Sequence, residues 1–202
     1  MGHIDYYFSL ISPWTYLGSR RLEQIAARHR ATIRPFPIDL GRVFPISGGL
    51  PLAKRAPQRQ AYRLVELARW RDFLKVPLTI HPQYFPANET QAAACVIATR
   101  LDHGDAKAVE LAHALMHGVW AGEKNIADPQ TVRDIVASVG LDAAALMKRA
   151  TDADIAAARD ADTEAAIALN VFGAPTYVID GELFWGQDRL DFVERKLAGA
   201  WA

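Results

Sequence analysis

Apolar and polar positions along the first forty residues change period twice. Residues 4–11 form a short, largely apolar run that predicts a strand. From residue 13 to residue 28 the apolar positions recur at helical spacing, which predicts an amphipathic helix. Residues 32–40 alternate partly and include Pro35 and Pro37, which favour a strand at the edge of a sheet. The order expected here is therefore strand, helix, strand.

Helical patterns dominate the middle of the chain. The stretch from Gly41 to about Pro57 is rich in glycine and proline and is expected to be a loop. Helical spacing then recurs over residues 58–75, 88–101, 106–121, 129–139 and 142–169. In the first of these helices most of the apolar face is formed by Tyr62, Val65, Leu67, Ala68, Trp70 and Leu74.

Strand patterns return only near the end of the chain. Residues 175–179 and 182–185 flank Asp180-Gly181, a pair suited to a type I′ hairpin turn, and a last helix is expected from about Asp188 to Leu197. The pattern predicts an α/β fold of order β-α-β, a helical block, then β-β-α. Residues 1–42 and 171–202 would form one thioredoxin-like domain, interrupted by an all-helical insertion over residues 43–170.

Charge and composition narrow the function classes. The 202 residues include 23 basic and 23 acidic side chains, so the chain has no net field to hold nucleic acid or an anionic membrane. No apolar run reaches the length of about 18 residues that a membrane-spanning helix needs. No signal-peptide pattern is present, and a cytoplasmic protein is expected.

The single cysteine excludes a second group of functions. Cys95 lies in an apolar helical stretch, where it is expected to be a buried small side chain rather than a reactive thiol. One cysteine cannot form an intramolecular disulfide or act as a dithiol oxidoreductase. His113 and His117 share a helical face but lack a third ligand, so no metal site is predicted.

Ser12-Pro13 stands where the first strand gives way to the first helix. Serine followed by proline is a common way to begin a helix, so Ser12 is first of all an N-cap. The same position lies beside the unpaired N–H groups of a helix N-terminus, which favour an anion. The Ser12 side chain can therefore cap the helix and also contact a bound anion, and it carries a hydroxyl rather than a thiol.

Two motifs near the C-terminus are further candidates. Phe172-Gly173-Ala174-Pro175-Thr176 fits a cis peptide before Pro175, although a trans proline opening an edge strand is the alternative. Phe184-Trp185-Gly186-Gln187-Asp188-Arg189-Leu190 places polar groups at the start of the last helix. Asp188 is either a plain N-cap or a ligand contact, and Trp185 is expected to be a core residue.

These motifs together resemble one family. The segments that carry the resemblance are residues 5–8, 12–17, 57–62, 172–176 and 185–190. They look like those of 2-hydroxychromene-2-carboxylate isomerases, which are relatives of kappa-class glutathione transferases and of DsbA-like thioredoxin-fold proteins. The resemblance spans nearly the whole chain. It implies glutathione as cofactor, a small electrophilic substrate and a homodimer.

The resemblance also assigns site residues by position. Ser12, followed by Pro13 and Trp14, matches the serine that contacts the glutathione sulfur. Ala174 matches the residue whose backbone pairs with the cysteinyl part, and Pro175 matches the cis proline. The remaining assignments are Gln187 and Asp188 for the γ-glutamyl end, and Arg59 where relatives carry a lysine near the glycyl carboxylate. The basic residues in or beside the first loop, which are candidates for the substrate carboxylate, are Arg34, Arg42 and Arg59.

The expected activity follows from that resemblance. It is glutathione-dependent isomerisation of a keto acid, of the type that converts 2-hydroxychromene-2-carboxylate to trans-o-hydroxybenzylidenepyruvate, by reversible thiolate addition. Ser12 would stabilise the thiolate. A kappa-like glutathione transferase and a non-enzymatic glutathione-binding domain are the two alternatives. Accumulating conjugate would indicate the first, and binding without turnover the second.

Overall fold

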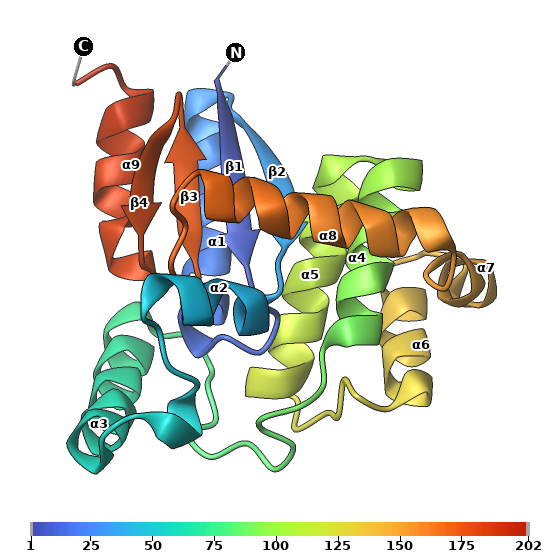
Figure 1. The fold of residues 1–202 in the computed structure, drawn as a ribbon, viewed down its shortest axis with the longest axis horizontal. Coiled ribbons are helices and arrows are strands. Elements are labelled where there is room, and N and C mark those ends of the chain that lie inside the picture. Colours follow the sequence, from blue (N-terminus) through green and yellow to red (C-terminus); the bar gives the residue numbers. More distant parts are fainter. Residues whose placement is uncertain (1, 201–202) are drawn as a thin grey trace.

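A four-stranded mixed sheet organises the molecule, and the computed structural model describes residues 2–200. Its strands are β1 (His3–Phe8), β2 (Thr32–Pro37), β3 (Thr176–Ile179) and β4 (Glu182–Trp185). They lie in the order β2-β1-β3-β4, with β1 parallel to β2 and both other pairs antiparallel (Figure 1). The two ends of the sequence therefore build one sheet, and the α/β prediction is confirmed.

Two local strand predictions are confirmed as well. β2, which carries Pro35 and Pro37, is an edge strand, where a missing N–H leaves no gap in the ladder. The β3–β4 turn has positive φ at both central residues, 51° at Asp180 and 82° at Gly181. A type I′ turn requires this backbone, and its twist matches that of the strands it joins.

The helices fall before, between and after the strands. They are α1 (Pro13–His29), α2 (Leu40–Ser47), α3 (Pro57–Leu74), α4 (Thr90–His103), α5 (Asp105–Trp120), α6 (Pro129–Ser138), α7 (Ala143–Arg149), α8 (Ala153–Ala168) and α9 (Leu190–Leu197). Two short 3₁₀ turns, η1 (Leu52–Lys54) and η2 (Gln187–Arg189), precede α3 and α9. Every element described between β2 and β3 is helical.

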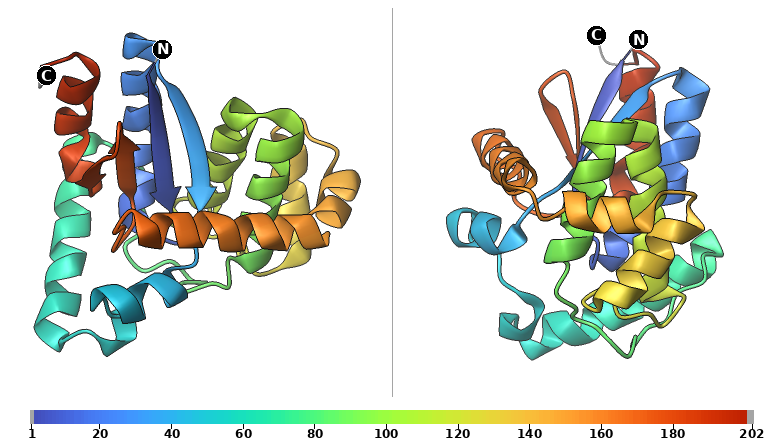
Figure 2. Two further views of the ribbon diagram at one scale, coloured as in Figure 1. Left: turned by 45° about the horizontal axis from the view of Figure 1, so that its top comes forward. Right: turned by 90° about the vertical axis from the view of Figure 1, so that its right-hand side faces the viewer.

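The sheet separates two apolar layers. Ile4, Tyr6 and Phe8 of β1 are buried in the larger core together with residues of α1 and α9. Tyr7, which points to the opposite face, packs with Val43 of α2 and Ala166 of α8 in a smaller cluster. Figure 2 shows α8 crossing one face of the sheet, with α1 and α9 on the other. The period of two along β1 thus builds both layers.

The loop predicted over residues 41–57 is wrong in part, because it contains α2 and η1. Asp39 caps α2 by accepting a hydrogen bond from the Gly41 N–H at 2.8 Å. The helix buries Val43 against α8, and Arg42 forms ion pairs with Asp160 and Glu164 of that helix. Tertiary packing thus makes a helix of a segment whose Gly41 and Pro45 favoured a loop.

Two helical predictions also need correction. Residues 142–169 form two helices, α7 and α8, because the chain turns between them at 150–152. The predicted apolar face of α3 is only partly buried. Leu67 is fully buried, whereas Tyr62 is 59% and Val65 46% exposed, because α3 lies below the sheet and beside α1 rather than inside the core (Figure 1).

The limits of the predicted domains, at 42/43 and 170/171, stay a prediction. Their outer ends, residues 1, 201 and 202, lie outside the described residues. Among residues 2–200 no helix combines the length and the apolar character needed to cross a bilayer.

Candidate functional site

Ser12 is the N-cap residue of α1, and hydrogen bonds hold both its side chain and its backbone. Its backbone is extended, with φ −81° and ψ 121°, and its Oγ accepts a hydrogen bond from the Thr15 N–H at 3.3 Å. Its own N–H donates to the Ser9 carbonyl at 3.2 Å. Pro13 occupies the first helical position, as its fixed φ favours. The first turn of α1 contains no acidic residue, so nothing there offsets the positive end of the helix.

The cis-proline loop lies directly against this helix start. The Ala174–Pro175 peptide bond is cis, as predicted. The Ser12 Oγ lies 3.5 Å from the Ala174 carbonyl oxygen, to which it donates at the long end of hydrogen-bonding distance. Ser12 and Ala174 are therefore neighbours in space, although 162 positions separate them in the chain. Both residues are half-buried and reachable from solvent.

The loop is fixed from its other side by β4. Thr176 Oγ1 donates to the Gly173 carbonyl at 2.8 Å, and the Gly186 N–H donates to the Pro175 carbonyl at 2.9 Å. A Cβ on Gly173 would lie 2.6 Å from the Trp185 Nε1, so glycine allows the indole ring to pack against the loop. Trp185 is 52% exposed and its ring is 4.9 Å from that of Phe172, so the prediction of a core tryptophan is wrong.

Gln187 and Asp188 lie on η2, close to α1. The Gln187 side chain is buried and accepts a hydrogen bond from the Arg21 guanidinium at 2.9 Å. A Cβ at Gly18 would lie 2.8 Å from the Gln187 Cβ, so the glycine permits this close contact. Asp188 is exposed and pairs with Arg189 at 2.8 Å. The Asp188 carboxylate is therefore accessible although paired with Arg189, whereas the Gln187 side chain is buried and already engaged, which leaves mainly its backbone.

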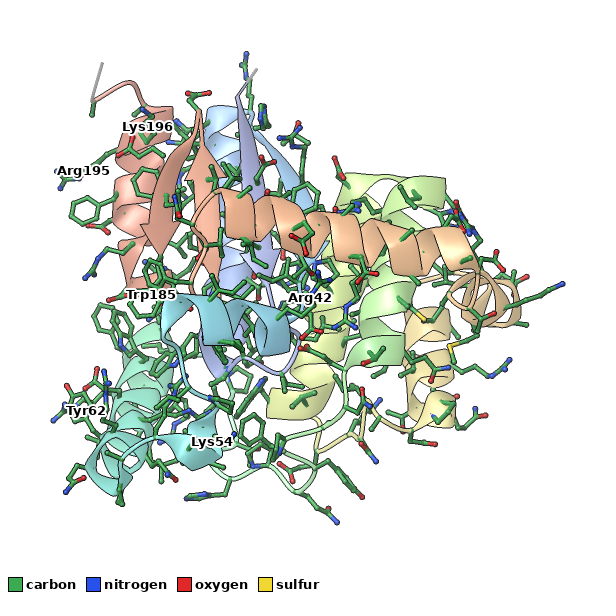
Figure 3. The ribbon with its side chains drawn as sticks, viewed as in Figure 1. Arg42, Lys54, Tyr62, Trp185, Arg195 and Lys196 are labelled. Carbon is green, nitrogen blue, oxygen red and sulfur yellow. The ribbon has the colours of Figure 1, made fainter. Side chains whose placement is uncertain are left out.

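The remaining predicted residues flank Ser12 or lie on α3. Trp14 is half-buried and packs against the main core, and Pro13 is buried. Arg59 is exposed in the first turn of α3 and forms no ion pair within residues 2–200. Figure 3 shows Trp185 at the lower end of β4, with Tyr62 on α3 and Lys54 on the turn before it. The ligand roles of these residues stay predictions.

Two of the three candidate arginines for a substrate carboxylate are already neutralised. Arg34 makes a two-point contact with Asp5 through its Nε and Nη2 atoms. Arg42 pairs with Asp160 and Glu164. Of the three, only Arg59 keeps an uncompensated charge among the described residues.

A further arginine, which the sequence did not single out, lies near Arg59 and Arg55. The Arg63 guanidinium lies over two aromatic rings, 5.3 Å from the centroid of Phe85 and 5.9 Å from that of Trp120. Burial, and then the charge of Arg55, lower the pKa of Arg63 to about 10. Within the described part of the chain neither Arg55 nor Arg63 has a carboxylate partner, so this end of α3 is short of negative charge.

Two further side chains with potential chemistry, Cys95 and His113, have partners inside the fold. Burial raises the pKa of the Cys95 thiol to about 12, and its Sγ contacts the Met147 Sδ at 3.7 Å, which confirms the expected buried cysteine. His113 is hydrogen-bonded to the Ser19 Oγ at 2.8 Å. Among residues 2–200 no three His, Cys, Asp or Glu side chains gather as a metal site would require.

Comparisons with known proteins identify the family of the chain. A family model described as a DSBA-like thioredoxin domain matches residues 3–198. A 2-hydroxychromene-2-carboxylate isomerase from Sphingobium xenophagum is 33% identical over 196 residues, which cover 96% of this chain and 97% of the relative. Glutathione S-transferase kappa 1 of Caenorhabditis elegans is 24% identical, covering 94% of this chain and 88% of the relative.

A solved structure extends the likeness to the backbone. The structure of a 2-hydroxychromene-2-carboxylate isomerase superposes with a TM-score of 0.81 at 28% sequence identity, covering 99% of this chain and 100% of that one. The thioredoxin-like architecture predicted from the sequence is therefore confirmed, together with its helical insertion. The chain belongs to the DsbA-like thioredoxin family, among the relatives of the 2-hydroxychromene-2-carboxylate isomerases.

Proposed function

We propose that this protein is a glutathione-dependent isomerase of an unsaturated keto acid, of the 2-hydroxychromene-2-carboxylate type. The observation that carries the proposal is the Ser12 hydroxyl at the N-terminus of α1, 3.5 Å from the Ala174 carbonyl beside a cis proline. The chain has no cysteine at this place. It therefore offers a thiolate-binding site rather than a thiol of its own.

The donors around Ser12 fit a glutathione molecule. The long contact to Ala174 leaves the Ser12 hydroxyl free to turn its hydrogen towards a sulfur anion. Ala174 precedes a cis proline and presents peptide groups to an extended backbone. The exposed Asp188 carboxylate suits an amino group, and the Arg59 guanidinium suits a carboxylate. These four residues would hold the sulfur, the cysteinyl backbone and the two ends of the tripeptide.

The free energies of these interactions are large enough to lower the pKa of a bound glutathione thiol. A free thiol with a pKa near 8.5 is only about 3% ionised at neutral pH. A hydroxyl hydrogen bond to a charged partner contributes about 1.5–3 kcal/mol. A helix N-terminus adds about 0.3–1 kcal/mol. After some desolvation these terms lower a bound thiol pKa by roughly one to two units, which makes about a quarter or more of it thiolate.

Glutathione, when bound, supplies a thiolate that adds reversibly to a conjugated double bond, so that the bond rotates and glutathione returns unchanged. Ser12 keeps the sulfur deprotonated before addition and stabilises the same charge again when the sulfur leaves. The N-terminus of α1 would favour the same anion, which helps the thiol to ionise before addition and helps the sulfur to leave afterwards. A site that stabilises the leaving anion favours reversal over release of a conjugate, and this favours an isomerase over a transferase.

The arginines without an acidic partner are the groups that we expect to bind an acidic substrate. We place the keto acid's carboxylate near Arg63, whose guanidinium is half-buried without an acidic partner in the described chain. An arginine binds a carboxylate through two parallel N–H bonds, and the partly exposed Phe85 ring offers an apolar surface beside it. An acidic, conjugated or aromatic electrophile matches both features.

The experiment is an isomerisation assay with 2-hydroxychromene-2-carboxylate and glutathione at one-hundredth of its concentration. We expect full conversion, complete recovery of glutathione, and a large loss of rate in Ser12→Ala. Undiminished turnover without glutathione would contradict the proposal. Stoichiometric consumption of glutathione would indicate a kappa-like transferase instead, an alternative supported by the kappa-class relative.

Two further expectations are held as proposals. A non-enzymatic glutathione-binding domain remains the second alternative, and binding without turnover of any conjugated electrophile would favour it. The homodimer implied by the resemblance stays a prediction, which sedimentation of the purified chain would test.

A further inference from the structure

One carboxylate, that of Glu89 at the start of α4, binds the β1–α1 loop. The Ser9 hydroxyl donates to Glu89 Oε1 at 2.8 Å, and the Ile11 N–H donates to Glu89 Oε2 at 3.2 Å. Each oxygen therefore binds a different donor, and the two donors lie on either side of Leu10. A carboxylate with both oxygens engaged in this way clamps the loop in one conformation.

One peptide bond and one hydrogen bond connect the residues that Glu89 holds to Ser12. Ile11 is the residue immediately before Ser12 in the chain. Ser9 is 2% exposed, and its carbonyl accepts the Ser12 N–H at 3.2 Å. Glu89 thus fixes the peptide that precedes Ser12 and the residue that binds the Ser12 amide. The backbone of Ser12, which carries the hydroxyl, is thus held at both points.

Glu89 serves this loop rather than its own helix. It directly precedes α4, but its side chain makes no capping hydrogen bond there. Asn88 provides a side-chain contact at that helix start, because its Oδ1 accepts the Thr90 N–H at 2.9 Å. A carboxylate near a helix N-terminus is favoured by the helix dipole, so α4 helps to keep Glu89 charged while its oxygens bind the loop.

Burial opposes the ionisation of the Glu89 carboxylate. Burial raises the pKa of Glu89, while the hydrogen bonds from Ser9 and Ile11 and the charge of Arg159 lower it. A half-buried carboxylate is unfavourable unless it accepts hydrogen bonds, so a purely structural need would be met more easily by a neutral side chain.

We propose that Glu89 is a positioning residue for the Ser12 site: its carboxylate, bound to Ser9 and Ile11, aims the Ser12 hydroxyl at the sulfur of the bound thiol. The inference rests on the proposed function in its last step, since the thiol is that of glutathione. The clamp itself exists without any ligand. It is therefore testable separately from the chemistry.

The experiment compares Glu89→Ala and Glu89→Gln with Asn88→Ala, which removes a side-chain contact at the same helix start without touching the loop. The first readout needs no glutathione. It is hydrogen exchange of the Ile11 amide, with the amides of β1 as internal reference. We expect exchange of Ile11 to become at least about tenfold faster in Glu89→Ala and to stay near native in Asn88→Ala.

The second readout is the pKa of bound glutathione, followed by thiolate absorbance, with kcat and KM in the isomerisation assay. Removing a negative charge alone would lower the thiol pKa, whereas misplacing Ser12 would raise it. We expect Glu89→Ala to raise it by roughly half a unit or more and to lower kcat more than it changes KM. Glu89→Gln, which keeps one acceptor oxygen in place, should restore at least half of the lost kcat.

The possible results distinguish failure of this inference from failure of the proposed function. Unchanged Ile11 exchange in Glu89→Ala, a lowered thiol pKa, or an equal effect of Asn88→Ala would each overturn the inference. If the native protein does not lower the pKa of glutathione, the proposed function fails. In that case faster Ile11 exchange in Glu89→Ala alone would still establish the clamp, and unchanged exchange would refute it.

Discussion

The hydroxyl oxygen of Ser12 lies 3.5 Å from the carbonyl oxygen of Ala174, across a separation of 162 positions in the chain. The contact joins the start of α1 to the loop before β3. It exists because β1 and β3 are neighbours in the sheet, so the segments at their ends meet at one edge. The chemistry that we propose depends on this proximity and on the absence of a thiol there.

Ser12 has two roles that substitution separates. Ser12→Ala removes the cap and should lower the free energy of unfolding by about 1 kcal/mol, whereas Ser12→Gly should lower it by only a few tenths. Both variants lack the hydroxyl, so both should lose at least about tenfold in kcat, because the lost hydrogen bond is to a charged group. Urea unfolding and the isomerisation assay measure the two effects. A Ser12→Gly variant with native kcat would reduce Ser12 to a cap.

Gly18 is expected to control the position of η2. In Gly18→Ala the new methyl group would lie 2.8 Å from the Gln187 Cβ and 3.0 Å from the Tyr177 Oη, so η2 must move away from α1. We expect a loss of about 1–3 kcal/mol in stability and a raised Kd for glutathione, because Asp188 moves with η2. Calorimetric titration measures the Kd.

Gly118→Ala is the matched control for that prediction. Gly118 is also helical, but its nearest contact is the Cδ1 at the flexible end of Ile135, at 3.0 Å. Its substitution should leave glutathione affinity unchanged. Equal affinities in the two variants would show that η2 does not contribute to binding.

Arg63 should determine how an acidic substrate is held. We expect Arg63→Met to raise KM for the keto acid by about tenfold or more, with a smaller change in kcat, because a charge-assisted pair contributes about 1.5–3 kcal/mol. The uncharged methyl ester of the substrate should show little difference between native and variant. Arg69→Met is the control, since Arg69 is exposed and pairs with Glu66 at 2.6 Å. An equal change for acid and ester would exclude the carboxylate contact.

His113 makes stability depend on pH. Burial, followed by the charges of Arg20 and His117, lowers the pKa of His113 to about 4 from 6.5. The unfolded state therefore binds more protons between these values, so this contribution is complete above about pH 6.5 and is lost as the pH falls towards 4. Since the ring is partly exposed, we expect a loss of about 1–2 kcal/mol from this group.

The measurement is the free energy of unfolding of native protein and of His113→Gln at pH 7.5 and 4.5. The native protein should lose more stability between the two pH values than the variant does. His103→Gln, a substitution at an exposed residue near the end of α4, should behave like the native protein. Parallel curves for native and His113→Gln would contradict the prediction.

Local chemistry made the element boundaries around the site predictable. Ser12-Pro13 fixes the start of α1, and Asp180-Gly181 fixes the β3–β4 turn. Each signal involves residues adjacent in sequence, so no tertiary information is needed. α2 escaped prediction for the opposite reason. Its Gly41 and Pro45 argue against a helix, and the contacts with α8 together with the Asp39 cap outweigh them.

The residues of the candidate site also fall into two groups, those recognisable from local sequence and those that depend on distant partners. Ser12 and Ala174 were found because a hydroxyl before a proline and a small residue before a proline are visible motifs. Glu89 and Arg63 are ordinary charged residues in helical patterns, and nothing in their neighbourhood along the chain distinguishes them. Their importance comes from partners far away in sequence: Ser9 for Glu89, at a separation of 80 positions, and the rings of Phe85 and Trp120 for Arg63.

The most direct test of the central claim is a pH titration of the ultraviolet thiolate absorbance of glutathione, with the native protein and with Ser12→Ala. We expect the native protein to lower the thiol pKa by roughly one to two units and the variant to lose most of that shift. An identical pKa in both proteins, or no binding by the native protein, would contradict the claim that Ser12 stabilises a glutathione thiolate.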